Sequence, residues 1–90
     1  MSWRHKGLKT FFETGSKKGI QTNYQRRIQL ILARLNVSIC PEDMDLPGLN
    51  FHPLKGDRSD EYAVKVSANW RIVFKFDGQN AHLVNYEDYH

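Results

Sequence analysis

The stretch that decides the fold is YAVKVSANWRIVFKFDGQNAHLVNYEDYH, residues 62–90. Between Trp70 and Phe76, large apolar side chains fall at every second position, as in a strand with one face against a core. Residues 62–67 alternate in the same way, Asp77-Gly78 is a hairpin-turn signal, and residues 81–86 return as a last strand. The stretch therefore predicts an antiparallel sheet of three short strands.

Ahead of the sheet, residues 8–15 have the period of a short helix. Leu8, Phe11 and Phe12 fall at i, i+3 and i+4, on one helical face. Gly15 follows them and suits the C-terminal cap of a helix. Residues 2–5 are a candidate short strand before this helix.

A second, more regular helix is predicted from Thr22 to about Asn36. Thr22 is a candidate N-cap, and Gln25 three residues later completes a possible capping box. The apolar stripe of this helix consists of Tyr24, Ile28, Ile31, Leu32 and Leu35. We expect the stripe to face the core and the arginines outside it to face water or a partner.

Two helices followed by an antiparallel sheet predict a single small α+β domain over residues 1–90, with the helices on one face of the sheet. Ninety residues suffice for one core, and no repeat or linker divides the chain. The period of two then puts Arg71, Val73 and Lys75 on the helix-free face. We expect that face to be shallow and open to a large substrate, with a further strand at 50–54 leading to the turn at its rim.

The net charge of +3 is unevenly distributed. Residues 1–34 contain eight Lys and Arg against one acid, whereas residues 35–61 contain two bases against six acids. A basic half favours a polyanionic partner, although surface cations also serve solubility alone. No apolar run is long enough to span a bilayer, and none follows the start of the chain as in a signal peptide. The lone Cys40 cannot form an internal disulfide. These features predict a cytoplasmic protein that does not bind membranes.

We predict no metal site and no cofactor. The three acids of residues 42–45 lie in an irregular, breaker-rich segment without a nearby histidine, which favours a solvated loop. His82, Asp88 and His90 are residue types that bind zinc, but their spacing matches no metal motif. Cys40 has no evident base beside it, so we expect no nucleophile there.

The remaining polar residues suit cleavage of RNA without a metal. Attack of a ribose 2′-OH on the neighbouring phosphate needs a base, a cation for the phosphate and an acid for the leaving oxygen. Arg71 suits the phosphate because its planar fork donates two parallel hydrogen bonds, although it could instead pair with Glu87 or Asp88. Tyr89 suits stacking on a base and His90 suits the acid. The sequence does not decide which of His52, Lys55 and Asp88 is the base that removes the 2′-OH proton.

Three blocks of sequence, HPLKGDR (52–58), ANWRI (68–72) and NYEDYH (85–90), closely resemble the HigB toxins, which belong to the RelE-like superfamily of bacterial toxin–antitoxin systems. The opening WRHKGL (3–8) is also similar, so the resemblance covers nearly the whole chain. It implies a RelE-like microbial RNase fold.

The resemblance also implies an activity: a ribosome-dependent endoribonuclease, or mRNA interferase, that enters the A site of the 70S ribosome and cuts the translated mRNA. It implies a HigA-like helix-turn-helix antitoxin as partner. The toxin would then bind operator DNA only indirectly, through this antitoxin. The active-site residues of the family fall on His52, Lys55, Arg71, Asp88, Tyr89 and His90. Asn69 is a weaker candidate for substrate contact, and Arg26, Arg27 and Arg34 would face ribosomal RNA.

Two other classes of function fit the same residues. A non-catalytic module could bind RNA or the ribosome through the basic surface, and an interaction protein could use the open sheet face only to dock a partner. The tail discriminates between these classes, because a nuclease depends on His90 and a binding module does not. Loss of a general acid typically slows a reaction ~10²–10⁴-fold.

Overall fold

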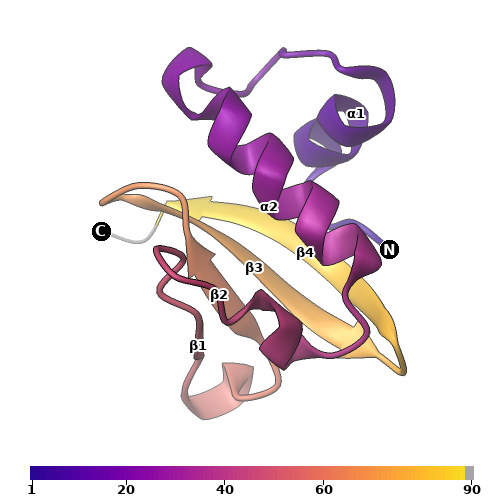
Figure 1. Cartoon of the computed structure of the whole chain (residues 1–90), viewed down its shortest axis with the longest axis vertical. Helices are drawn as coiled ribbons and strands as arrows, with labels where there is room; N and C mark the ends of the chain where they lie inside the picture. Colours follow the sequence, from indigo (N-terminus) through magenta and orange to yellow (C-terminus); the bar gives the residue numbers. More distant parts are fainter. Residues whose placement is uncertain (89–90) are drawn as a thin grey trace.

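The computed structural model describes residues 1–88, which form two α-helices and a four-stranded antiparallel sheet (Figure 1). The helices are α1 (Lys6–Thr14) and α2 (Gln25–Val37), with short 3₁₀ helices η1 (Thr22–Tyr24), η2 (Pro41–Met44) and η3 (Gly56–Arg58). The strands are β1 (His52–Pro53), β2 (Tyr62–Lys65), β3 (Trp70–Asp77) and β4 (Asn80–Asp88), in the order β1-β2-β3-β4. The predicted α+β class, with the helices before the sheet, is confirmed.

Helix α1 is capped at both ends. At its start, Nδ1 of His5 accepts a hydrogen bond from the Leu8 N–H at 3.1 Å. At its end, Gly15 takes a left-handed conformation (φ 78°) and its N–H donates to the Phe11 carbonyl, as the sequence predicts. Leu8 and Phe11 are buried, whereas Phe12 is exposed at the margin of the predicted apolar face, with its ring 5.7 Å from that of Trp3.

The predicted capping box at Thr22 is wrong. Thr22 belongs to the 3₁₀ helix η1, and α2 begins only at Gln25, without a side-chain cap. The 3₁₀ turn moves the N-cap by two residues, from Thr22 to Tyr24, and the Gln25 side-chain amide donates to the Ile20 carbonyl at 3.3 Å. The helix ends at Val37, close to the predicted end.

The core lies between the helices and one face of the sheet. Helix α2 crosses this face (Figure 1), and the four aliphatic residues of its predicted stripe, Ile28, Ile31, Leu32 and Leu35, are all buried. The sheet contributes Val64, Ile72, Phe74 and Tyr86, while α1 adds Leu8 and η2 adds Met44. None of the described helices is long and apolar enough to cross a membrane.

A bulge in β4 changes which of its residues reach the core. Val73 pairs with Asn85 but Lys75 pairs with His82, so β4 has one residue more than β3 between these pairs. Leu83 lies in this interval in the left-handed region (φ 52°). The extra residue lets both Ala81 and Val84 be buried although they are three positions apart, which a strict period of two does not predict.

The N-terminal segment lies along β4. Ser2 and Arg4 exchange backbone hydrogen bonds with Ala81 and Val84, at 2.8–3.2 Å. Trp3 forms one isolated parallel bridge with Val84. The candidate strand at residues 2–5 is therefore reduced to a single bridge on the edge of the sheet.

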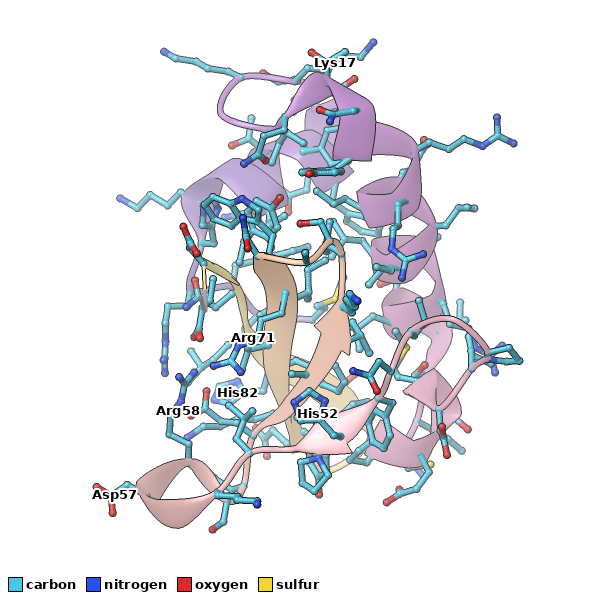
Figure 2. All side chains as sticks on the ribbon, turned by 90° about the vertical axis from the view of Figure 1, so that its left-hand side faces the viewer. Lys17, His52, Asp57, Arg58, Arg71 and His82 are labelled. Atoms are coloured by element: carbon cyan, nitrogen blue, oxygen red, sulfur yellow. The ribbon has the colours of Figure 1, made fainter. Side chains whose placement is uncertain are left out.

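The helix-free face is less open than the sequence suggests. Ala63 and Val73 are fully buried although the register assigns them to this face. Figure 2 shows this face, with Arg58, Arg71, His52 and His82 distributed over it. The face thus has a thin buried layer of its own beneath a polar surface.

The burial of α2 gives a direct test of the fold. We expect Leu32→Ala to lower the free energy of unfolding by about 2–5 kcal/mol, because Leu32 is fully buried. Leu30→Ala removes the same atoms two positions away, where the side chain is 63% exposed, and should change stability by less than about 0.5 kcal/mol. Denaturant unfolding measures both, and equal losses would contradict this placement of the helix.

Candidate active site

The strand register brings His52 and Arg71 to the same face of the sheet. His52 pairs with Ala63, which pairs with Val73, so these three residues form one row across the sheet. Arg71 belongs to the next row, between Lys65 and Glu87. Directly paired residues project to the same face, and β1 and β3 are separated by two strand spacings, about 10 Å. The predicted imidazole and guanidinium therefore face one common surface.

Glu87 is the centre of the charged groups on this surface. Its Oε1 accepts hydrogen bonds from Nη2 of Arg71 at 3.2 Å and from Nη1 of Arg58 at 3.1 Å. Its Oε2 accepts from Nη2 of Arg58 at 2.5 Å and from Nδ2 of Asn85 at 3.1 Å. The side chains of Arg71 and Glu87 are only 16% and 18% exposed, so water screens this pair weakly. We call Arg58, Glu61, Arg71 and Glu87 the arginine–glutamate cluster.

Arg58 connects this cluster to the turn that follows β1. Its Nε and Nη2 donate to Glu61 at 2.8 and 3.2 Å while its other bonds reach Glu87. The N–H of Leu54 donates to the Glu61 carbonyl at 2.9 Å, which closes the turn at its base. The turn with Lys55 is thus tied to β4 by one guanidinium.

These contacts change the proton affinities of the cluster. Hydrogen bonds from Arg58 lower the pKa of Glu61, against an opposing effect of burial. Burial by itself would raise the pKa of Glu87, but hydrogen bonds from Arg58 and Arg71 outweigh it and hold that pKa below the ordinary value. The same two carboxylates raise the pKa of Arg58. Arg58, Glu61 and Glu87 are therefore charged at neutral pH.

The His52 ring is oriented by the backbone. Its Nδ1 lies 2.9 Å from the carbonyl oxygen of Asn50, and a carbonyl can only accept, so Nδ1 carries the proton. In the neutral ring the lone pair is then on Nε2, the nitrogen that can take a proton from a substrate. This arrangement suits the base role that the sequence leaves open for His52.

Lys55 lies at the start of the turn and is exposed. It precedes η3, and Gly56 next to it has φ 67°, a conformation that glycine adopts without strain. The Lys55 carbonyl accepts from the Arg58 N–H at 3.4 Å within this turn. Lys55 and Arg58 are therefore held in one short segment beside the sheet.

Asp88, the predicted tail residue that the structure describes, lies at the end of β4. Asp88 is exposed and pairs in register with Trp70, so by the period of two it projects to the face opposite Glu87 and Arg71. Asn69 precedes Trp70, so it lies at the same end of the sheet, and its N–H donates to Oγ of Ser67 at 3.4 Å. Tyr89 and His90 lie outside the described residues.

The three arginines of α2 differ in their surroundings. Arg27 donates to the carbonyls of Gly48 and Lys65 at 2.7–3.1 Å, which joins α2 to the loop before β1 and to the end of β2. Nε of Arg34 donates to the Asp43 carbonyl at 3.2 Å, whereas Arg26 is exposed. Arg27 and Arg34 thus have structural contacts, and contact of all three with RNA stays a prediction.

Sequence reasoning did not select Arg58, Glu61 or Glu87 as site residues. Arg58 and Glu87 are 29 positions apart, and only the strand register shows that they meet. The available signal was that they carry opposite charges and belong to two of the three blocks that carry the family resemblance. Within residues 1–88, no group of three or more His, Cys, Asp or Glu side chains could hold a metal ion.

Comparisons with known proteins support the resemblance. A family model described as the RelE-like toxin of the type II toxin–antitoxin system HigB matches residues 1–90. The chain is also similar to a protein of Proteus vulgaris named Endoribonuclease HigB, at 39% identity over 89 residues. That match covers 99% of this chain and 97% of the Proteus vulgaris protein, so both helices and the whole sheet are included.

The cluster predicts a pH dependence of stability. The pKa values of Glu61 and Glu87 are lower in the folded chain than their ordinary value of 4.5, so the unfolded chain binds protons first as the pH falls. We expect the free energy of unfolding to be maintained above about pH 4.5 and to decrease below it, as these carboxylates become protonated. Denaturant unfolding between neutral pH and pH 3 measures this decrease.

The variant Glu87→Gln should show a smaller decrease in acid, because it lacks one of the two carboxylates. Glu13→Gln, which changes an exposed glutamate of α1, is the matched control and should follow the unmodified chain. Identical acid profiles for Glu87→Gln and the unmodified chain would show that the cluster is not coupled to folding.

Proposed function

The chain belongs to the family of RelE-like HigB toxins of type II toxin–antitoxin systems, and from that membership we propose that it is a ribosome-dependent endoribonuclease that cleaves mRNA during translation. The toxin class and an antitoxin partner follow from the family. The observation that supports the catalytic proposal is the strand register, in which His52 and Arg71 project to one face, with the Lys55 turn tied to Glu87 of β4 through Arg58.

The proposed reaction is attack of the ribose 2′-oxygen on the adjacent phosphorus. A base removes the 2′ proton, the new P–O bond forms, the bond to the 5′-oxygen breaks, and an acid protonates that oxygen. The products are a 2′,3′-cyclic phosphate and a free 5′-hydroxyl, without a metal ion. Arg71 stabilises the charge that develops on the phosphate, as fixed hydrogen-bond donors do in other phosphoryl-transfer sites.

The remaining roles are assigned by chemistry. His90 is the proposed acid and Tyr89 the proposed stacking surface for a splayed base. The base is one of His52, Lys55 and Asp88, and the contact between His52 and the Asn50 carbonyl favours His52 because it leaves Nε2 able to accept the proton. Asn69, at the same end of the sheet as Asp88, is a proposed substrate contact.

The shape of the site supports the proposed dependence on the ribosome. The surface is one face of a sheet, and a flexible RNA strand on such a face samples many conformations besides the in-line geometry of attack. The A site of the 70S ribosome would present the mRNA already extended. Arg26, Arg27 and Arg34 of α2 would face ribosomal RNA. A HigA-like helix-turn-helix antitoxin would neutralise the toxin, and only the antitoxin would contact operator DNA directly. Translation places this activity in the cytoplasm.

The catalytic proposal predicts that His90→Ala and Arg71→Ala abolish growth arrest and slow mRNA cleavage on ribosomes ~10²–10⁴-fold. Mapping of new mRNA 5′ ends after expression measures the cleavage. Lys17→Ala, an exposed cation far from the site in Figure 2, is the control and should remain toxic.

Three outcomes of this experiment separate the functions. Full cleavage by either variant would remove the catalytic proposal. Ribosome binding without cleavage by the unmodified chain would identify a non-catalytic binding module. Rapid cleavage of the same mRNA without ribosomes would contradict the ribosome dependence.

The basic helices predict a salt dependence. Affinity for the ribosome should fall steeply as salt rises, because phosphate contacts release counterions. Arg26→Ala should make the slope of log affinity against log salt shallower by about one phosphate contact, since Arg26 is exposed on α2. Gln29→Ala, exposed on the same helix and uncharged, is the control. A flat salt response of the unmodified chain would show that these helices face something other than RNA.

A further inference from the structure

Glu87 lies where three segments of the proposed site meet. It accepts hydrogen bonds from Arg71 in β3, from Arg58 at the end of η3 and from Asn85 two residues earlier in β4. The Glu87 carboxylate that accepts these hydrogen bonds is largely removed from water. Charge-assisted hydrogen bonds in such surroundings are stronger and more directional than exposed ion pairs. Glu87 therefore fixes the relative positions of its partners.

Arg58 extends this connection to Lys55. Its guanidinium is shared between Glu61, whose side chain is 8% exposed, and Glu87. Arg58 is three residues after Lys55 in the same turn, and its N–H donates to the Lys55 carbonyl. A continuous chain of contacts thus runs from the Lys55 turn through Arg58 and Glu87 to Arg71.

A carboxylate beside the arginine that is proposed to bind phosphate has both a cost and a gain. The two guanidiniums and the two carboxylates of the cluster cancel in net charge. Glu87 consequently weakens the attraction of Arg71 for a phosphate, so its presence is a cost for binding. The gain is orientation, because a long arginine side chain that is already fixed loses less freedom when the substrate arrives.

We propose that Glu87 is a positioning residue of the nuclease, which holds the Arg71 guanidinium in the orientation for the scissile phosphate and, through Arg58, fixes the Lys55 turn against the end of β4. This inference rests on the proposed function, because it assumes that Arg71 binds the reacting phosphate. Glu87 itself does not touch the RNA in this arrangement. Its effect on the reaction passes through Arg71 and the turn.

The test is single-turnover mRNA cleavage on programmed ribosomes with saturating toxin. We expect Glu87→Ala to slow cleavage about 10²-fold, the effect of a displacement near 1 Å in a catalytic group. The toxin concentration at half-maximal rate should not rise, since Glu87 opposes phosphate binding. Glu87→Gln keeps the shape of the side chain and should retain part of the rate, which also provides a folded variant if Glu87→Ala does not fold.

A matched control is available on the same face of the sheet. Asp60 pairs with Lys75 of β3 at 3.1 Å and does not contact the cluster in any described bond. Asp60→Ala removes a carboxylate from a cation as Glu87→Ala does, and should leave the cleavage rate within about twofold of the unmodified chain. A large loss in Asp60→Ala would show that any ion pair on this face matters equally and would overturn the specific role of Glu87.

Combining Glu87→Ala with Arg71→Lys tests whether Glu87 acts through Arg71 or independently of it. If Glu87 acts in part through Arg71, then the double variant Glu87→Ala, Arg71→Lys should lose clearly less than the product of the two single losses. A double variant that shows both losses multiplied would overturn the inference. A second readout needs no catalysis: in a ¹⁵N spectrum, the Nη protons of a held guanidinium give separate signals, and those of Arg71 should merge in Glu87→Ala.

Failure of this inference differs from failure of the proposed function. If Arg71→Ala cleaves as fast as the unmodified chain, the proposed function is wrong. If Arg71→Ala loses cleavage while a folded Glu87→Ala remains within about twofold of the unmodified chain, or the Arg71 signals stay separate in that variant, only the positioning role is overturned.

Discussion

The pairing of β3 with β4 is the constraint on which the rest of the structure depends. On one side of these strands it sets Ile72 beside Tyr86 beneath α2, and so defines the core. On the other side it sets Arg71 beside Glu87, and so defines the arginine–glutamate cluster. A slip of one residue would exchange the two faces and remove both the core and the site together. Stability and the candidate chemistry are therefore fixed by one set of backbone hydrogen bonds.

The strand-like alternation of residues 70–76 and the helical stripe of residues 24–35 were sufficient to predict the class of the fold. Both are strong periodic signals, because burial of one face imposes them directly. The bulge at Leu83 could not be predicted, since a left-handed residue other than glycine leaves no local signature. The start of α2 was placed too early because Thr22 and Gln25 have the right types for a capping box, while the 3₁₀ turn that separates them depends on tertiary packing.

In the site, too, residue types could be predicted from the sequence, whereas contacts between distant residues could not. His52 and Arg71 were chosen for their chemistry, and the register places them on one face. The contact of Arg58 with Glu87 was not predicted, because pairing across 29 positions is a property of the sheet. Arg27 illustrates the converse: its charge suggested an RNA contact, yet its guanidinium joins α2 to the carbonyls of Gly48 and Lys65. A count of cations does not distinguish a binding arginine from one that completes backbone hydrogen bonding.

The N-terminal residues that lie along β4 have a consequence for the behaviour of the chain at high concentration. Unpaired strand edges are templates for association with other chains, and natural sheets protect them. Here Ser2 and Arg4 occupy the first part of the β4 edge, and the opposite edge strand, β1, has only two residues, one of which is Pro53. Proline cannot donate to a ladder, so this edge is a poor template for further pairing. The β1 edge and the first part of the β4 edge of this toxin are therefore poorly suited to pairing with another chain.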